Sequence, residues 1–313
     1  MAGRSDPLRY AIGRARLSGS KKTIYNHKKE AHRFVDTLRE LGMGVQKWTN
    51  ITNRHVGLVV EQWRQDMSPA TIKSYLSGVR AVCRAFGNDS IHVSNDEFGV
   101  ARRVLITNED KAVSNEVYER VVTTLRSSVD PLRVRIALLL EYERVFGMRF
   151  EEASKFNPYR DFDGETAHIH LGTKGGRPRW LGVWNDEQQE LMERAQASGY
   201  YRSPKDGLIP ADLTEEKWRN RVYNRIRPLG LTMEEDGTMH GLRHAYAQER
   251  FEHLTGFAPP VCFDSKEEFE AQALERGGPD WREADELARC VIREEMGHSP
   301  TRDDIDSQYL GKW

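Results

Sequence analysis

Apolar side chains recur every three or four positions along the first hundred residues. Between residues 21 and 42 the apolar positions have the spacing of one helix face, and they are Ile24, Ala31, Phe34, Val35, Leu38 and Leu41. The same spacing returns after Thr52 and again after Ser68 and Pro69, a pair typical of a helix start. The pattern predicts a small bundle of helices over residues 20–107.

The helical period is lost over residues 88–110, which are polar and are expected to form a linker. It returns near residue 111, so we expect a second, mainly helical domain over residues 111–313. The expected helices include NEVYERVVTTL, PLRVRIALLLEYERVF and the ranges 185–198, 214–226, 240–254, 266–275 and 281–296.

One stretch of the second domain has a period of two. Ala167, Ile169 and Leu171 alternate with His168 and His170, and a glycine-rich turn precedes RWLGV. This alternation is typical of a β-hairpin. The chain is therefore predicted to be mainly α, with a helical N-terminal domain and an α+β second domain that holds one small hairpin.

The net charge of −1 hides an uneven distribution. Residues 1–107 hold 18 Lys and Arg against nine Asp and Glu, whereas the remainder holds 29 against 39. A basic N-terminal half, with a basic arm at residues 1–19, favours a polyanion such as double-stranded DNA as its partner. A solvated basic helix face is the simpler alternative. The candidate DNA-binding residues are Lys73, Arg80, Arg84, Arg102 and Arg103.

Several classes of protein are not favoured. The longest apolar run, IALLLEY, is too short to span a membrane, and the basic N-terminus has no apolar segment typical of a secretory signal. Cys83, Cys262 and Cys290 are odd in number and widely spaced, so neither a disulfide framework nor a structural zinc site is expected. These features favour a reduced cytoplasmic location.

Two stretches place cationic residues beside glycines. In FGMRFEEASKF, Arg149 is followed three residues later by Glu152, a spacing that also fits a simple surface ion pair. In GTKGGRPR, Lys174 lies at the predicted hairpin turn, where glycines allow close approach of a ligand. A solvated lysine is the default interpretation of this second stretch alone.

Two further stretches contain histidines. In MHGLRHAYA, His240 and Arg243 share one face of a helix start, a place that suits a phosphate. His240 and His244 have the spacing of a zinc pair, but the glutamate of the HExxH motif is missing, so a metal is not favoured. Near the end, His298 follows a glycine and Tyr309 lies eleven residues further on. His298 as a helix cap and Tyr309 as a packing residue are the structural alternatives.

Together these stretches resemble the tyrosine recombinase (phage integrase) family. The similar pieces are GMRFEE, TKGGRPR, HGLRH, and MGH followed by QYL, in that order. SPATIKSYLSGVRAVCRAF is also similar to the DNA core-binding domain of that family, so the resemblance spans roughly residues 20–313.

The resemblance implies how DNA would be cleaved. Arg149 and Arg243 would clamp the non-bridging oxygens of a phosphodiester. Tyr309 would attack phosphorus and form a 3′-phosphotyrosyl link that preserves the energy of the broken bond. No metal ion and no cofactor would then be required.

The remaining roles also follow from the resemblance. Lys174 would protonate the departing 5′ oxygen, His240 would transfer a proton at the nucleophile, and His298 would donate a hydrogen bond to the phosphate. Glu152 would orient the site, with a purely stabilising ion pair to Arg149 as the alternative.

The implied partners are specific double-stranded DNA sites and, on DNA, three further copies of the chain. A monomer or dimer is expected free in solution, with an accessory directionality factor as a further partner, no membrane association and a nucleoid location. Alternatives are a type IB topoisomerase and a non-catalytic DNA-binding protein of the same fold. A mobile-element integrase is favoured over a chromosome-dimer resolvase.

Two features depart from the family pattern. Arg243 and His298 are 55 residues apart, about twice the family spacing, and the surplus at about 256–286 is acidic. We expect this insertion to form helices away from DNA, either for contact between protomers or as a solvated addition. Only LGKW follows Tyr309, so Trp313 or the insertion is expected to link protomers.

Overall fold

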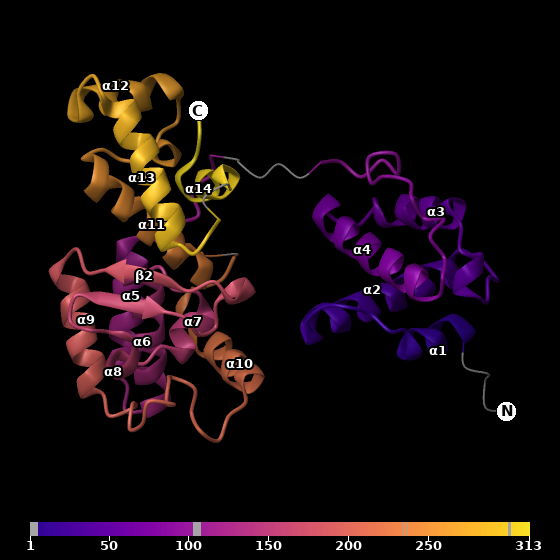
Figure 1. Cartoon of the computed structure of the whole chain (residues 1–313), viewed down its shortest axis with the longest axis horizontal. Helices are drawn as coiled ribbons and strands as arrows, with labels where there is room; N and C mark the ends of the chain where they lie inside the picture. The colour runs from indigo at the N-terminus through magenta and orange to yellow at the C-terminus, as the bar shows by residue number, and fades with distance from the viewer. Residues whose placement is uncertain (1–5, 103–107, 234, 236, 300–301) are drawn as a thin grey trace. The chain divides into compact units, whose positions relative to one another are not determined.

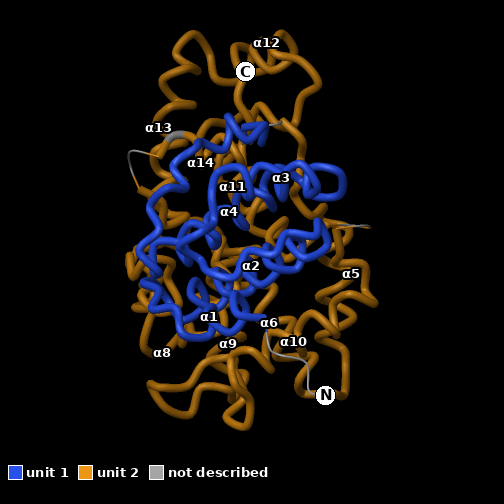
Figure 2. The backbone as a smooth tube through the Cα atoms, turned by 90° about the vertical axis from the view of Figure 1, so that its right-hand side faces the viewer, with its two compact units in different colours: residues 1–104 blue, residues 105–313 orange. Residues whose placement is uncertain are grey.

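The computed structural model describes residues 6–102, 108–233, 235, 237–299 and 302–313. The chain divides into two compact units, residues 1–104 and 105–313, which Figure 2 colours separately. Each unit has its own buried apolar core.

The first unit is a bundle of helices, as the spacing of apolar residues predicted (Figure 1). Its elements are α1 (Pro7–Arg14), α2 (Lys21–Glu40), the 3-10 turn η1 (Trp48–Asn50), α3 (Asn53–Trp63) and α4 (Pro69–Ala85). Ser68 caps α4 by accepting a hydrogen bond from the Thr71 amide. Gly78 lets α4 cross α2 closely, because a Cβ there would lie 2.8 Å from the Cβ of Glu30.

The ends of this unit correct the expected arm and linker. Helix α1 is part of the bundle, since Leu8 and Ile12 are fully buried and Trp48 Nε1 donates to the Leu8 carbonyl at 3.1 Å. Ile91 and Val100, placed in the linker by their polar surroundings, are buried in the same core. Two apolar residues in a short segment are too few to reveal a period, so only the folded chain shows these contacts.

The second unit is mainly helical. Its elements before the hairpin are α5 (Asn115–Arg126), α6 (Pro131–Val145), α7 (Phe150–Lys155) and α8 (Pro158–Asp161). The elements after it are α9 (Asp186–Ala197), α10 (Glu215–Ile226), η3 (Arg227–Leu229), α11 (Met239–Thr255), η4 (Pro260–Cys262), α12 (Lys266–Gly277), α13 (Trp281–Glu295) and α14 (Asp303–Leu310). None of the helices in these described ranges is long and apolar enough to cross a bilayer.

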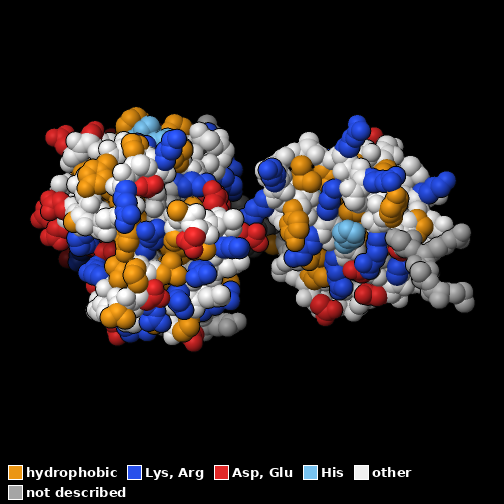
Figure 3. Space-filling view, turned by 90° about the horizontal axis from the view of Figure 1, so that it is seen from below, with side chains coloured by type: hydrophobic (Ala, Val, Ile, Leu, Met, Phe, Trp, Pro, Cys, Tyr) orange, Lys and Arg blue, Asp and Glu red, His pale blue; other side chains and the backbone are white. Residues whose placement is uncertain are grey.

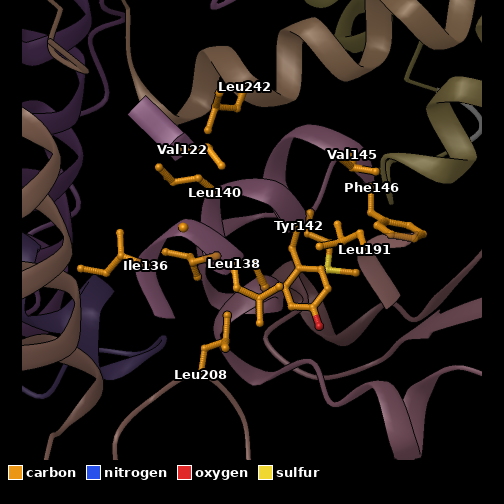
Figure 4. Close-up of a cluster of buried hydrophobic side chains, with 14 of the residues drawn as sticks. Val122, Ile136, Leu138, Leu140, Tyr142, Val145, Phe146, Leu191, Leu208 and Leu242 are labelled. Atoms are coloured by element: carbon orange, nitrogen blue, oxygen red, sulfur yellow. The ribbon is translucent and has the colours of Figure 1, made fainter. Parts of the chain in front are cut away.

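Helix α6 is the centre of the second unit. Its residues from Ile136 to Val145 are all buried, and Figure 4 shows Leu138, Leu140 and Tyr142 among the apolar side chains around it. Because α6 packs against both α5 and α11, its C-terminal end is held rigidly. That end leads directly to Arg149.

The predicted hairpin is confirmed. Strands β1 (Thr166–Ile169) and β2 (Arg179–Gly182) are antiparallel, and Ala167 lies opposite Leu181. Ala167 and Ile169 are buried as their alternation predicted. The turn between the strands holds the 3-10 segment η2 (Lys174–Gly176).

The acidic insertion contributes to a third apolar cluster. Phe257, Phe269 and Trp281 pack edge-on or tilted against one another, and their cluster also contains Phe251 of α11 and Tyr309 of α14. The insertion is therefore a packed support for the C-terminal helix, not a solvated addition. Contact between protomers through it stays a prediction.

Candidate active site

The end of α6, the start of α11, the end of α13 and helix α14 bring most of the predicted catalytic residues together. Arg243 of α11 is 1% exposed, and its guanidinium donates hydrogen bonds to the carbonyls of Gly147 and Met296. Arg149 Nη2 donates to the same Met296 carbonyl at 3.0 Å. The two arginines thus converge on one point, the carbonyl oxygen of Met296.

Tyr309 lies beside this point. Arg243 Nε donates to the Tyr309 hydroxyl at 3.4 Å, and the ring is 6% exposed. Helix α14 presents the phenol to the arginines because α14 packs on α11 and α13. The structure therefore combines a packing role for the ring with a hydroxyl directed at the arginine pair.

Two glycines of the site have left-handed backbones, and one of them, Gly297, lies against the arginines. Gly147 and Gly297 have φ of 56° and 67°, in the left-handed region that favours glycine. A Cβ on Gly297 would lie 3.1 Å from Arg179 Nη1 and 3.3 Å from Arg149 Nη1. Side chains at this position would therefore push the guanidinium groups out of place.

We expect Gly297→Ala to slow DNA cleavage by about 10- to 100-fold, because small displacements of catalytic groups are costly. The variant should also lose about 1–2 kcal/mol of stability from its strained backbone. Gly199→Ala is the matched control, since Gly199 has φ 72° and open space around it. Equal cleavage rates for the two variants would contradict a role for Gly297 in arginine placement.

Glu152 holds two arginines in position. Its carboxylate, 1% exposed, accepts from Arg149 Nη1 at 2.8 Å and from both terminal nitrogens of Arg179 at 2.8 and 2.6 Å. Burial alone would raise the pKa of Glu152, but the hydrogen bond and charge of Arg179, with the charges of Arg243 and Arg149, lower it to about 2. By contrast, burial raises the pKa of Glu143 on α6 well above its ordinary value, despite the nearby charge of Arg243.

We expect Glu152→Gln to destabilise the second unit by about 3–5 kcal/mol at neutral pH, because buried guanidinium groups lose their carboxylate. A pKa lowered from 4.5 to about 2 means that the stabilisation is complete above about pH 5 and is lost as the pH falls toward 2. Denaturant unfolding of both proteins at several pH values tests this. A difference that does not shrink between pH 5 and pH 3 would contradict it.

Arg179 was missed in the sequence analysis. It is 4% exposed and pairs with Ile169 in the hairpin register. Its position in the strand provided a signal, because the alternation that buries Leu181 also directs Arg179 inward. A buried arginine in a short strand needs a carboxylate partner, and Glu152 is that partner.

Three histidines surround the Tyr309 ring. The ring centroids of His244, His240 and His298 lie 4.5, 5.8 and 6.0 Å from that of Tyr309. Burial, followed by the positive charge of Arg243 and other neighbours, lowers the pKa of His240 to about 4 and that of His298 to about 3. His298 Nε2 is buried and has no hydrogen-bond partner among the described residues. Neutral imidazoles therefore line the site, and His298 has one buried nitrogen without a partner.

His244 was considered in the sequence only as a second zinc ligand. It is 6% exposed, and burial and the neighbouring His240 lower its pKa to about 3. Among the described residues no group of three or more His, Cys, Asp or Glu side chains is arranged to bind a metal. The close contact of His244 with Tyr309 fits a packing role beside the phenol.

Lys174 is not brought together with the other predicted residues. It is exposed at the hairpin turn, and within the described ranges it has no ion-pair or hydrogen-bond partner. The base of the hairpin is held against the site, since a Cβ on Gly172 would lie 2.5 Å from the Glu151 carbonyl group. The turn that carries Lys174 faces solvent.

Among the predicted DNA-binding residues, Arg80 is used inside the first unit. Its guanidinium donates to Asn95 Oδ1 at 2.8 Å and to the Val93 carbonyl at 2.7 Å. These bonds hold residues 93–95 against α4, so the structure favours a structural role for Arg80 over the expected phosphate contact. The helical pattern placed Arg80 on the polar face but gave no sign of this partner.

The other predicted DNA-binding residues differ in accessibility. Arg84 is exposed, Lys73 is half-buried, and Arg102 is exposed but paired with Asp96 at 3.0 Å. Arg103 lies outside the described residues. Figure 3 shows Lys and Arg side chains spread over one face of the first unit, in keeping with its basic composition.

Comparisons with known protein families match the two units of the chain separately. A family model described as integrase matches residues 101–249, and one described as phage integrase, N-terminal, matches residues 11–92. Among curated protein sequences none matches. The integrase match contains Arg149, Lys174, His240 and Arg243 and ends before the acidic insertion.

Solved structures share the fold at low sequence identity. XerH recombinase in a post-cleavage complex with a palindromic difH substrate has 16% identity, covers 97% of this chain and 90% of its own, and has a TM-score of 0.54. A lambda integrase tetramer on a Holliday junction has 15% identity, 97% and 77% coverage and a TM-score of 0.59. Tn1549 transposon integrase with circular intermediate DNA has 12% identity, 99% and 96% coverage and a TM-score of 0.57.

A helical first unit, followed by a helical second unit with one small hairpin, is the fold of a tyrosine recombinase. The chain belongs to the phage integrase family of these proteins, because the two matched ranges take in most of its length and both units. This places it among the proteins of site-specific DNA recombination.

Proposed function

We propose that this chain cleaves and rejoins specific DNA sites through a 3′-phosphotyrosyl intermediate, with Tyr309 as the nucleophile. The observation that carries the proposal is the 3.4 Å hydrogen bond from Arg243 Nε to the Tyr309 hydroxyl, at the point where Arg149 and Arg243 converge. A phosphate held by both guanidinium groups would lie next to the phenol oxygen.

In the proposed step, the Tyr309 oxygen bonds to phosphorus as the bond from phosphorus to the 5′ oxygen breaks. The phenol proton passes to His240, whose imidazole is unprotonated at neutral pH because burial and the charge of Arg243 lower its pKa to about 4. His298 donates a hydrogen bond from Nε2 to a phosphate oxygen. Rejoining is the reverse reaction, with the 5′ hydroxyl as the nucleophile, and consumes no ATP.

Lys174 supplies the proton to the departing 5′ oxygen. Because it faces solvent at the hairpin turn, it acts only once bound DNA lies against that turn. The glycines at 175 and 176, with φ of 75° and 71°, let the turn backbone approach DNA without side-chain clashes.

The partner proposed for both units is double-stranded DNA, and four copies assemble on paired sites. Support comes from the similar structures, which include a lambda integrase dimer on a core site and a tetramer on a Holliday junction. We further propose a mobile element as the substrate, integrated or excised at the nucleoid with an accessory directionality factor. The matches to lambda and Tn1549 integrases support this choice.

Two experiments, carried out one after the other, test the proposal. Recovery and sequencing of DNA bound by the protein defines its site, and a nicked duplex built on that site should then trap a covalent adduct. Mass spectrometry should locate the DNA on the peptide that contains Tyr309. Relaxation of supercoiled plasmids that lack the site would favour a topoisomerase, and binding without an adduct would favour a non-catalytic DNA-binding protein.

A further inference from the structure

The chain that follows Tyr309 is held by a residue from the opposite end of the second unit. Asn108 is the first described residue of that unit, and its side-chain amide bonds the backbone of Lys312 twice. Asn108 Nδ2 donates to the Lys312 carbonyl at 2.8 Å, and the Lys312 amide donates to Asn108 Oδ1 at 2.8 Å. A pair of bonds of this kind fixes both the position and the direction of a backbone segment.

Other contacts hold the same segment from different sides. Arg289 of α13 donates to the Gly311 carbonyl at 3.1 Å, and Trp313 Nε1 donates to the Pro260 carbonyl at 3.2 Å. Gly311, with φ of 75°, fits closely, since a Cβ there would lie 2.7 Å from the Val261 amide nitrogen. The segment therefore has one tightly defined path away from α14.

Helix α14 depends on such contacts for its position. It has eight residues, and helices this short are not stable by themselves. Near its middle, Asp306 pairs with Arg293 at 3.2 Å and with Arg289 at 3.7 Å. At its end, Gln248 donates to the Tyr309 carbonyl at 3.5 Å, and Asn108 holds the residues that follow. Rotation of α14 is limited by these two sets of contacts.

The backbone of Asn108 is unusual. Its φ of 49° makes it the one non-glycine residue of the described ranges in the left-handed region. Asparagine adopts this conformation more readily than most residues, and strain of this kind persists only where surrounding contacts require it. The two bonds to Lys312 are the contacts that this backbone conformation permits.

Resting on the nucleophile role proposed above for Tyr309, we propose that Asn108 is a positioning residue for DNA cleavage. By holding Lys312, it sets the rotation of α14 and so keeps the Tyr309 hydroxyl at the arginine pair. Asn108 lies outside the four motif stretches GMRFEE, TKGGRPR, HGLRH and MGH with QYL, and its side chain bonds Lys312 and not the phenol or the arginine pair.

Asn108→Gly provides a direct test, because glycine keeps the left-handed backbone and removes both hydrogen bonds. We expect adduct formation in a single turnover to slow about 10- to 100-fold, with DNA affinity and melting temperature close to wild type. Gly311→Ala should show the same defect by a separate route. Lys312→Ala is the control, since Lys312 is held through its backbone, and it should react at the wild-type rate.

A substrate with sulfur in place of the bridging 5′ oxygen distinguishes positioning from proton donation. Sulfur leaves without a proton, so Lys174→Ala should be rescued on this substrate and Asn108→Gly should remain slow. A wild-type rate for Asn108→Gly, rescue of it by sulfur, or a loss of rate matched by a loss of folded protein would each overturn the proposal.

Hydrogen exchange separates this proposal from the assignment of Tyr309. Amides of residues 307–311 should exchange faster in Asn108→Gly than in wild type, whether or not the protein forms an adduct. Unchanged exchange would overturn the positioning role. Absence of a wild-type adduct, or an adduct that persists in Tyr309→Phe, would instead overturn the proposed function.

Discussion

We expect Tyr309→Phe to abolish the covalent adduct with DNA and to leave DNA binding and folding intact. The change removes only the hydroxyl that Arg243 Nε contacts at 3.4 Å, while the buried ring keeps its packing against His244. Without that oxygen no bond to phosphorus forms, so the rate of adduct formation should fall by more than about 10⁴-fold. A denaturing gel of protein mixed with the nicked substrate measures this directly.

Tyr118→Phe is the matched control for this variant. Tyr118 lies in α5 of the same unit and is 5% exposed, close to the 6% of Tyr309. It should form the adduct at the wild-type rate, and the two variants should unfold at similar temperatures. A wild-type yield of adduct from Tyr309→Phe would mean that another residue attacks the DNA.

Arg243→Lys should slow adduct formation by about 10³-fold. Lysine keeps the positive charge but loses the planar fork that holds two phosphate oxygens at once. It also cannot reproduce the separate bonds to the carbonyls of Gly147 and Met296 and to the Tyr309 hydroxyl. Because Arg243 is fully buried, the variant should in addition lose about 1–3 kcal/mol of stability.

Arg250→Lys separates these two effects. Arg250 lies on the same helix and makes a comparable paired contact with Glu295 of α13, but it has no contact with Tyr309. It should lower stability without slowing cleavage at a temperature where the protein is folded. If the two lysine variants lost activity in parallel, the effect of Arg243→Lys would be one of stability and not of catalysis.

The sequence predicted those parts of the site in which the proposed catalytic residues lie within a short, recognisable motif. Residues of the motifs are recognisable one stretch at a time, and the helix that carries Arg243 and the hairpin that carries Lys174 follow from their apolar spacing. The convergence of Arg149 and Arg243 on the Met296 carbonyl is a contact between residues far apart in the chain. The spacing of apolar residues does not indicate which distant residues come into contact. The distances within the site are therefore known only from the folded structure.

The sequence pattern did not reveal the contacts of residues whose partners are distant in the chain, for the same reason. Arg80 was expected to contact DNA because its partners within the unit lie in a segment with no regular period. Arg179 lies in a short strand and Asn108 in a stretch with no regular period, and their importance comes from Glu152 and from Lys312, respectively. Arg179 could have been found from the principle that a charged side chain directed into the core needs a charged partner. No local feature of the sequence indicates the role of Asn108.

The charges around Glu152 determine whether the pocket binds intact DNA or the transition state of cleavage more tightly. Arg149 and Arg179 pair with this one ionised carboxylate, and the charge of Arg243 lies near it. Three guanidinium groups and one carboxylate leave this cluster with an excess of about two positive charges, which the packing of the folded chain holds in place. A phosphodiester carries one negative charge, but the five-coordinate phosphorus formed by phenolate attack carries two. The pocket therefore matches the charge of the transition state more closely than that of intact DNA, which is the condition for catalysis.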